Sequence, residues 1–163
     1  MKLLSKKVVN LNNSNLNVSI FKIESDSDLF GASRVYVLGV NKGGSVCIIF
    51  NAKRKIWGFP GGHIDEGESV TEAIKRESME ECGYSLEIVE PKFVIENVVD
   101  DKVEKQVICF GRFEHNINKL NAAEGETVTD VRFVNLSELN TLISLPQVWS
   151  EIIEEFELWL KNT

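Results

Sequence analysis

Apolar and polar residues alternate in several short runs of this chain, a pattern that predicts β-strands with one buried face. The runs are Leu16 to Ile23, Arg34 to Val40, Val46 to Phe50, Phe93 to Val99, Val103 to Phe113 and Val131 to Val134. The turn residues Asn41-Lys42-Gly43-Gly44 separate the second run from the third, and Asp100-Asp101-Lys102 separate the fourth from the fifth. Such turns predict hairpins. We therefore expect a mixed or antiparallel sheet.

Two other stretches have the three- and four-residue apolar spacing of a helix. Ser69-Val70-Thr71-Glu72 has the form of a capping box, and Gly83 suits the left-handed position after a last turn. The first helix should therefore run from about Val70 to Cys82. The second begins behind Pro146, and its apolar positions are Val148, Ile152, Ile153, Phe156, Trp159 and Leu160. We expect this amphipathic helix to lie against the sheet.

The chain reads as one unit, because no repeat, low-complexity tract or Pro/Gly-rich linker divides its 163 residues. We expect a single domain over residues 1–163, in which residues 1–30 are an N-terminal extension with a strand and Asn10 to Asn17 is a soft polar stretch. Met1 to Ser14 lacks the apolar run of a signal peptide, and no segment approaches the roughly 20 apolar residues of a membrane span. These features indicate a cytoplasmic protein with no membrane partner.

The formal net charge is −7, from 18 basic and 25 acidic residues. This balance disfavours long nucleic acid as a partner. A small phosphorylated ligand remains compatible with it, because divalent cations can supply the positive charge. The three cysteines, Cys47, Cys82 and Cys109, are widely spaced and form no Cys-x-x-Cys pair, so we expect reduced core thiols.

Glutamates gather on the first helix. At about 100° per residue, Glu77, Glu80 and Glu81 fall on the apolar stripe that begins at Val70. Carboxylates at this spacing repel one another, and their position in line with a buried face adds desolvation. Mg²⁺ is bound by a few carboxylates together with waters and substrate phosphates, so it would compensate them. The alternative is a solvated acidic patch.

The loop before this helix has two adjacent glycines, which let a backbone approach a metal or phosphate closely. Loop and helix together match the pattern G-x5-E-x7-R-E-U-x-E-E-x-G-U, where U is a bulky apolar residue. The matching glycine and charged residues are Gly62, Glu68, Arg76, Glu77, Glu80, Glu81 and Gly83. From Gly62 to Tyr84 the chain thus resembles the Nudix hydrolase family. It departs at Ser78, where the family has an aliphatic residue; we expect Ser78 at the edge of the buried stripe.

The resemblance implies an α/β (α+β) fold, a Nudix-like α/β/α sandwich with a mixed central sheet. It also implies a hydrolase that uses Mg²⁺, with Mn²⁺ as the alternative, to cleave a pyrophosphate bond in a nucleoside diphosphate derivative. The implied metal-binding set is the Gly61 carbonyl, Glu77, Glu80 and Glu81. Arg76 and Glu68 would support these groups by hydrogen bonds.

The resemblance leaves the general base open between Glu77 and a loop acid, Glu126 ahead of Glu124. The predicted catalytic set is Glu77, Glu81, Glu126 and Arg76. The predicted substrate-binding residues are Trp57, Phe59 and Gly62, although aromatic residues beside a glycine turn equally suit core packing. His63 and His115 read as surface or packing residues.

The lead-in from Trp57 to Gly62 resembles that of members that cleave nucleoside triphosphates, oxidised ones included, to monophosphate and pyrophosphate. ADP-ribose, a dinucleotide or a sugar nucleotide are alternative substrates, and a catalytically silent nucleotide-binding sensor is the alternative function. RNA-end processing requires a basic groove, which neither the charge balance nor any Lys/Arg run indicates. The sequence leaves monomer and homodimer equally open.

Overall fold

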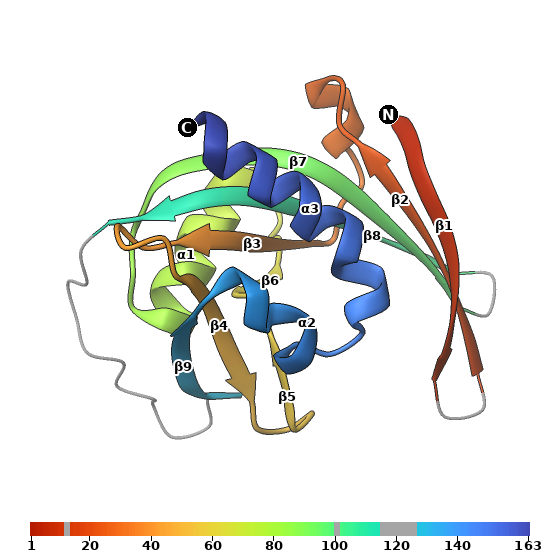
Figure 1. Cartoon of the computed structure of the whole chain (residues 1–163). Coiled ribbons are helices and arrows are strands. Elements are labelled where there is room, and N and C mark those ends of the chain that lie inside the picture. The colour runs from red at the N-terminus through yellow and green to blue at the C-terminus, as the bar shows by residue number, and fades with distance from the viewer. Residues whose placement is uncertain (12–13, 100–101, 115–126) are drawn as a thin grey trace.

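The fold is built on one mixed β-sheet with helices on both faces (Figure 1). The computed structural model describes residues 1–11, 14–99, 102–114 and 127–163. The strands are β1 (Lys2–Leu11), β2 (Ser14–Lys22), β3 (Arg34–Val40), β4 (Val46–Asn51), β5 (Ile56–Gly58), β6 (Gly61–His63), β7 (Leu86–Val99), β8 (Lys102–Phe113) and β9 (Val128–Val134). The helices are α1 (Val70–Cys82), α2 (Leu139–Leu142) and α3 (Pro146–Asn162), with 3-10 turns η1 (Asp26–Leu29) and η2 (Leu136–Glu138).

The strands lie in the order β1-β2-β7-β8-β3-β4-β5, with β6 paired to β3 and β9 paired to β4. β3 and β8 run parallel in register from Arg34 opposite Gln106 to Val40 opposite Arg112. The other pairs of these strands are antiparallel. The expected mixed sheet is therefore confirmed.

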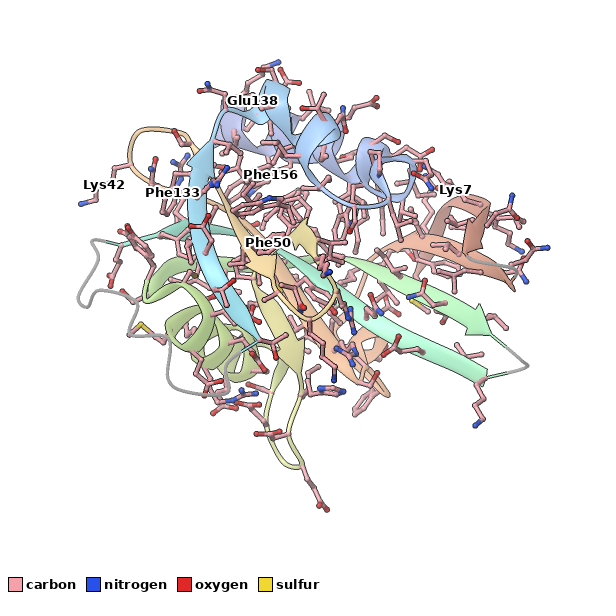
Figure 2. The ribbon with its side chains drawn as sticks, turned by 90° about the horizontal axis from the view of Figure 1, so that it is seen from below. Lys7, Lys42, Phe50, Phe133, Glu138 and Phe156 are labelled. Atoms are coloured by element: carbon pink, nitrogen blue, oxygen red, sulfur yellow. The ribbon has the colours of Figure 1, made fainter. Side chains whose placement is uncertain are left out.

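Helix α3 covers one face of the sheet. Ile20, Leu38, Ile108 and Phe110 pack there in one apolar cluster with Phe156 of α3. Figure 2 shows Phe156 below the helix, on the side of the sheet. The amphipathic stripe that the sequence predicts is thus the surface by which this helix binds the sheet.

Helix α1 covers the opposite face, where Val37, Cys47 and Cys109 pack against Ile74 and Cys82. Strand residues point alternately to the two faces, so neighbouring positions of β3 enter different clusters. The α/β/α arrangement expected from the resemblance is confirmed. The three cysteines are free and buried, as predicted, and burial raises the pKa of the Cys109 thiol.

The N-terminal segment differs from the prediction of a soft stretch from Asn10 to Asn17. β1 and β2 form a long antiparallel hairpin, in which Val8 pairs with Asn17 and Lys2 with Lys22; residues 12–13 lie outside the description. β1 is the edge strand, and Val9 is its buried hydrophobic residue. Because polar residues occupy much of an edge strand, the apolar alternation that marks an inner strand is weak here.

Other strands are longer than their apolar runs. β7 begins at Leu86 rather than at the predicted Phe93, because a bulge between Pro91 and Phe93 interrupts the alternation. The first predicted hairpin is formed only at its closed end, where Val40 pairs with Val46. The predicted turn at Asp100 and Asp101 falls outside the described residues. Among the described helices, none has the length and apolarity to cross a membrane.

Candidate active site

The start and end of α1 are determined locally, as the sequence predicts. Ser69 caps the helix by accepting a hydrogen bond from the Glu72 amide at 3.2 Å, and the Glu72 carboxylate accepts from the Ser69 amide at 2.9 Å. Gly83 ends the helix with φ of 72°, a conformation that favours glycine. These caps fix the residues at which the glutamate-bearing helix begins and ends.

Arg76 joins the loop to the helix. Its guanidinium donates two hydrogen bonds to Glu68, at 3.0 and 2.9 Å, and one to the His63 carbonyl at 2.9 Å. It also donates to Glu77 at 2.9 Å and to Glu80 at 3.1 Å. The carboxylates of Glu68, foremost, and Glu77 hold the pKa of Arg76 above its ordinary value. A fork of this kind fixes the orientation of planar carboxylates.

The Glu77 carboxylate lies directly against the Gly62 backbone. A β-carbon at position 62 would approach the Glu77 Oε1 atom to 2.3 Å, so a side chain there would displace the carboxylate. Partial burial raises the pKa of Glu77 above its ordinary value, although the hydrogen bond and charge of Arg76 act in the opposite direction. The Glu77 carboxylate therefore occupies the space that is left because Gly62 has no side chain.

The Glu81 carboxylate is tied to the same loop, because the Gly61 amide donates to its Oε2 atom at 2.8 Å. Gly61 has φ of 149°, and a β-carbon there would lie 2.1 Å from the Val35 carbonyl oxygen of β3. Only glycine fits this close approach. The loop backbone and the last turns of α1 thus form one unit.

The glutamates are not equivalent, which corrects the expectation that all three share the apolar stripe. Glu77 and Glu81 line a cavity, whereas the Glu80 side chain is 57% exposed. Ser78 is fully buried and does not lie at the edge of the stripe as predicted. The reason is that Ser78 lies one turn below Ile74, at the centre of the buried face, and Glu80 is turned about 100° from Glu81.

The donor chemistry fits a divalent cation. One guanidinium faces Glu68, Glu77 and Glu80, and Glu81 adds a further carboxylate beside the loop. The four carboxylates thus outnumber the single guanidinium that bonds to three of them, and oxygen donors of this kind suit hard cations. Among the described residues, no three acidic, histidine or cysteine side chains already form a metal-ligand group. In this structure Arg76 holds the carboxylates of Glu68, Glu77 and Glu80, and the Gly61 amide holds that of Glu81.

The cavity beside these glutamates has a volume of about 770 Å³. From the loop and α1 it is lined by Gly61, Gly62, His63, Glu77 and Glu81. Other lining residues, which the sequence analysis did not select, come from the strands, from the β4–β5 loop and from α3; they include Leu16, Val18, Arg34, Lys53, Arg54, Asn97, Gln106 and Trp149. A cavity of this size accommodates a ligand as large as a nucleotide.

The sequence held a signal for some of these missed residues. Asn97 lies on the same face of β7 as the buried residues Phe93 and Ile95. Gln106 lies on the same face of β8 as the buried Ile108. A polar residue at a strand position that otherwise points to the core indicates that the buried face borders a cavity there.

The loop between β4 and β5 held a second missed signal. Lys53-Arg54-Lys55 is a short basic run, although we expected no Lys/Arg run that would indicate a basic groove. Lys53 and Arg54 line the cavity, where they bring positive charge into an otherwise acidic protein.

The aromatic residues predicted to bind substrate occupy different surroundings. The Trp57 ring packs on Phe50, with centroids 5.2 Å apart, and the Arg132 guanidinium lies over it at 4.5 Å. Phe59 is buried, touches the cavity and meets the Trp149 ring edge-on at 4.7 Å. The third predicted residue, Gly62, lines the cavity.

The loop acids proposed as alternative bases, Glu124 and Glu126, lie outside the described residues, as does His115.

A mixed sheet between helices, with a glycine loop and a glutamate-rich helix at a cavity, defines the class of this α/β protein. A model of the NUDIX domain matches residues 32–156, and the chain belongs to this family. Nudix hydrolases generally use a divalent metal.

The comparisons with individual proteins agree with this membership. The chain is 36% identical over 50 residues to a Bacillus subtilis (strain 168) protein named "Putative 8-oxo-dGTP diphosphatase"; the alignment spans 31% of this chain and 34% of that protein. It resembles the Bacillus subtilis pyrophosphohydrolase BsRppH with a TM-score of 0.64 and 19% identity, covering 85% of this chain and 91% of the other. The NUDIX domain of Shewanella oneidensis NrtR, complexed with ADP ribose, has a TM-score of 0.63 and 19% identity over 84% of this chain and 94% of the other.

Proposed function

We propose that this protein is a metal-dependent Nudix pyrophosphohydrolase that converts a nucleoside triphosphate, oxidised forms included, to the monophosphate and pyrophosphate. The observation that carries the proposal is the pair Glu77 and Glu81, which the glycine loop holds at the edge of a nucleotide-sized cavity. Family membership supports the same chemistry.

The proposed metal-binding set is Glu77, Glu80, Glu81 and the Gly61 carbonyl, with Mg²⁺ as the first candidate and Mn²⁺ as the second. When bound, such a cation neutralises phosphate oxygens and lowers the pKa of an attacking water. Arg76 orients the carboxylates of Glu77 and Glu80 through its hydrogen bonds. Glu77 is half-buried and lines the cavity, so it is the preferred base among the described residues.

The charges around the cavity support a polyphosphate substrate. Lys53 and Arg54 face the same cavity as the glutamates and offer counter-charge to phosphates that the metal does not reach. The names of similar proteins include an 8-oxo-dGTP diphosphatase and a pyrophosphohydrolase, which agree with a triphosphate, and an ADP ribose complex, which keeps that ligand as the alternative.

The proposed organisation is one domain over residues 1–163. β2 supports this because it pairs with β7 from Asn17 opposite Val98 to Lys22 opposite Phe93, which makes the N-terminal hairpin part of the central sheet. A cytoplasmic location is supported by the three free, buried thiols, since reduced cysteines are usual in that compartment.

The test is a hydrolysis assay with Glu81→Gln beside the wild type. We expect the wild type to release monophosphate and pyrophosphate from a triphosphate in Mg²⁺, to stop in EDTA, and to resume when Mg²⁺ or Mn²⁺ is restored. Glu81→Gln should lower turnover by about 10²-fold or more, because it removes a charged oxygen ligand. Glu87→Gln is the matched control, since Glu87 is an exposed glutamate in β7 beyond the helix.

A wild type that binds nucleotides but hydrolyses no triphosphate, dinucleotide or sugar nucleotide would replace the proposal with the sensor. Cleavage of ADP-ribose in preference to every triphosphate would overturn the substrate class alone. Near-normal turnover by Glu81→Gln would reject the assignment of that residue.

A further inference from the structure

The central sheet continues past α1 into the N-terminal hairpin. Phe21 of β2 lies opposite Val94 of β7, and both pack in the apolar cluster beneath α1. Side chains alternate along a strand, so Ser19 and Asn17 of β2 point to the same face as Phe21. Figure 1 shows α1 on one side of the molecule and the β1–β2 hairpin on the other. The hairpin therefore extends this face beyond the helix that covers it elsewhere.

Strand register aligns three valines on the extended face. Val8 of β1 lies opposite Asn17, Asn17 opposite Val98, and Val98 opposite Val103 of β8. Directly opposed residues point to the same side of a sheet, so these four side chains form one row across four strands. Val8 is 63% exposed and Val103 is 62% exposed, and Val98 between them is half-buried. This valine row is thus open to solvent.

Exposed apolar residues gather around this row. Of the eight large hydrophobic residues that are exposed in the described part of the chain, six lie in or beside these strands: Met1, Leu3, Leu4, Val8, Phe30 and Val103. Phe30 is 80% exposed, and its carbonyl accepts a hydrogen bond at 2.7 Å from Lys105, which points to the same face as Val103. Single exposed apolar residues are normal on a protein surface, but their concentration on one side indicates a binding surface.

The opposite face of the hairpin already has a partner in α3. The Ser5 hydroxyl donates to the Glu151 carboxylate at 2.5 Å, and the Lys7 ammonium forms an ion pair with the same carboxylate at 3.2 Å. Val9 is buried on that face. Because these alternate residues of β1 point to α3, Val8 points away from it. The face with the valine row is therefore the one that a further molecule can reach.

The charges on this face favour a second copy of the chain as its occupant. On one side of the valine row, strand register aligns Lys6, Ser19, Glu96 and Lys105. On the other side, Asn10 lies opposite Asn15. With two cations and one carboxylate the face is nearly neutral, whereas the whole chain has a net charge of −7. A strongly acidic or basic partner finds little counter-charge here, but a second copy brings a face of the same kind.

A two-fold axis along the valine row keeps like charges apart. Such an axis places Val8 of one copy over Val8 of the other. It also places the lysine-bearing row of each copy over Asn10 and Asn15 of the other copy. Carboxamide oxygens accept hydrogen bonds from ammonium groups, so the polar margins of the two faces match.

The size of the face predicts how tightly two copies bind. Four strands about 4.8 Å apart, followed from Leu3 to Asn10 at about 3.4 Å per residue, span roughly 450 Å² per copy. Interfaces below about 600 Å² per partner belong to weak and transient complexes. We therefore expect a reversible dimer with a Kd of roughly 50–500 µM.

We propose that the protein forms a two-fold homodimer in which the exposed faces of β1, β2, β7 and β8 pack on each other along the valine row. This interface does not depend on the proposed hydrolytic activity. Leu16 and Val18, the neighbours of Asn17 in β2, point to the opposite face and line the cavity. Only the thickness of the sheet thus separates the dimer interface from the cavity.

Sedimentation equilibrium of the full chain over roughly 5–500 µM tests the proposal. We expect mostly monomer at the lowest concentration and about half of the chains or more in dimers at the highest. Val8→Glu and Val103→Glu should each weaken the association at least about tenfold, because each brings a pair of uncompensated carboxylates into the interface. Leu158→Glu is the matched control, since Leu158 is an exposed apolar residue of α3 outside this face, and it should associate as the wild type does.

An equimolar mixture of Val8→Glu and Val8→Lys tests the position of the axis. Each variant alone places two like charges opposite each other, whereas a mixed dimer places a carboxylate opposite an ammonium group. The mixture should therefore associate at least about threefold more tightly than either variant alone.

Thermal unfolding of each variant establishes that the variants are folded before their association is compared. A wild type that stays monomeric at every concentration overturns the proposal. It is equally overturned if folded Val8→Glu and Val103→Glu associate as Leu158→Glu does, or if the mixture associates no more tightly than the separate variants.

Discussion

Ser78 is the residue at which this chain departs from its family pattern, and its replacement by alanine should make the protein more stable. The Ser78 side chain is 0% exposed at the centre of the buried face of α1. Its hydroxyl has no hydrogen-bond partner among the residues that the structure describes. A buried hydroxyl without a partner costs roughly 1–3 kcal/mol.

The expected gain follows from three contributions. Ser78→Ala removes the cost of the unpaired hydroxyl, and alanine adds a few tenths of a kcal/mol in helix propensity. The void left by one oxygen atom subtracts less than about 1 kcal/mol. We therefore expect the free energy of unfolding to rise by about 1–2 kcal/mol. The thermal midpoint should rise by roughly 2–4 °C for each kcal/mol.

Urea denaturation followed by circular dichroism measures this change, with Ser69→Ala as the control in the same helix. Ser69 is the helix cap, and its hydroxyl accepts from the Glu72 amide at 3.2 Å. Loss of that cap should lower stability by about 1 kcal/mol, so the same substitution should act with opposite sign nine residues apart. A Ser78→Ala protein no more stable than the wild type would refute the reasoning, because the hydroxyl would then have a partner in solution.

Two further outcomes are expected. Gly62→Ala should lower turnover by about 10²-fold while the circular dichroism spectrum is retained, because the new β-carbon would lie 2.3 Å from the Glu77 carboxylate; unchanged turnover would mean that this position of the carboxylate is not needed. Hydrogen bonds from Ser5 and Lys7 lower the pKa of Glu151, so their stabilisation is present above the ordinary carboxyl pKa and is lost as the pH falls through the folded-state value. The thermal midpoint of the wild type should thus fall more steeply in acid than that of Glu151→Gln, and parallel curves from about pH 3 to about pH 7 would contradict the contact.

Helix α1 and its loop could be predicted from the sequence because their determinants are local. The capping box at Ser69 and Glu72, and the left-handed Gly83, are interactions within one turn of the chain. The two adjacent glycines predict a close approach of the backbone to a metal or phosphate, and in the structure Gly62 leaves the space that the Glu77 carboxylate occupies. Spacing along a helix was enough to bring these groups together.

The same spacing could not rank the glutamates. Glu80 is exposed and bound to Arg76, whereas Glu81 accepts from the Gly61 amide. The difference arises because the loop passes only the side of the helix that bears Glu81. Ser78 was likewise placed at the edge of the stripe, because helical angle alone does not say how far the sheet extends around α1.

The sequence by itself thus determined most of the strands, the two main helices and the acidic loop–helix unit, since these follow from periodicity and from contacts close along the chain. Periodicity left the sheet open as mixed or antiparallel. Only the tertiary structure decided what faces that unit. Leu16 and Asn97 become neighbours of one cavity through strand register, and Trp149 reaches it from the last helix. Pairing between segments so distant in sequence depends on which strand edges are free and which faces must be buried. No local pattern encodes that choice.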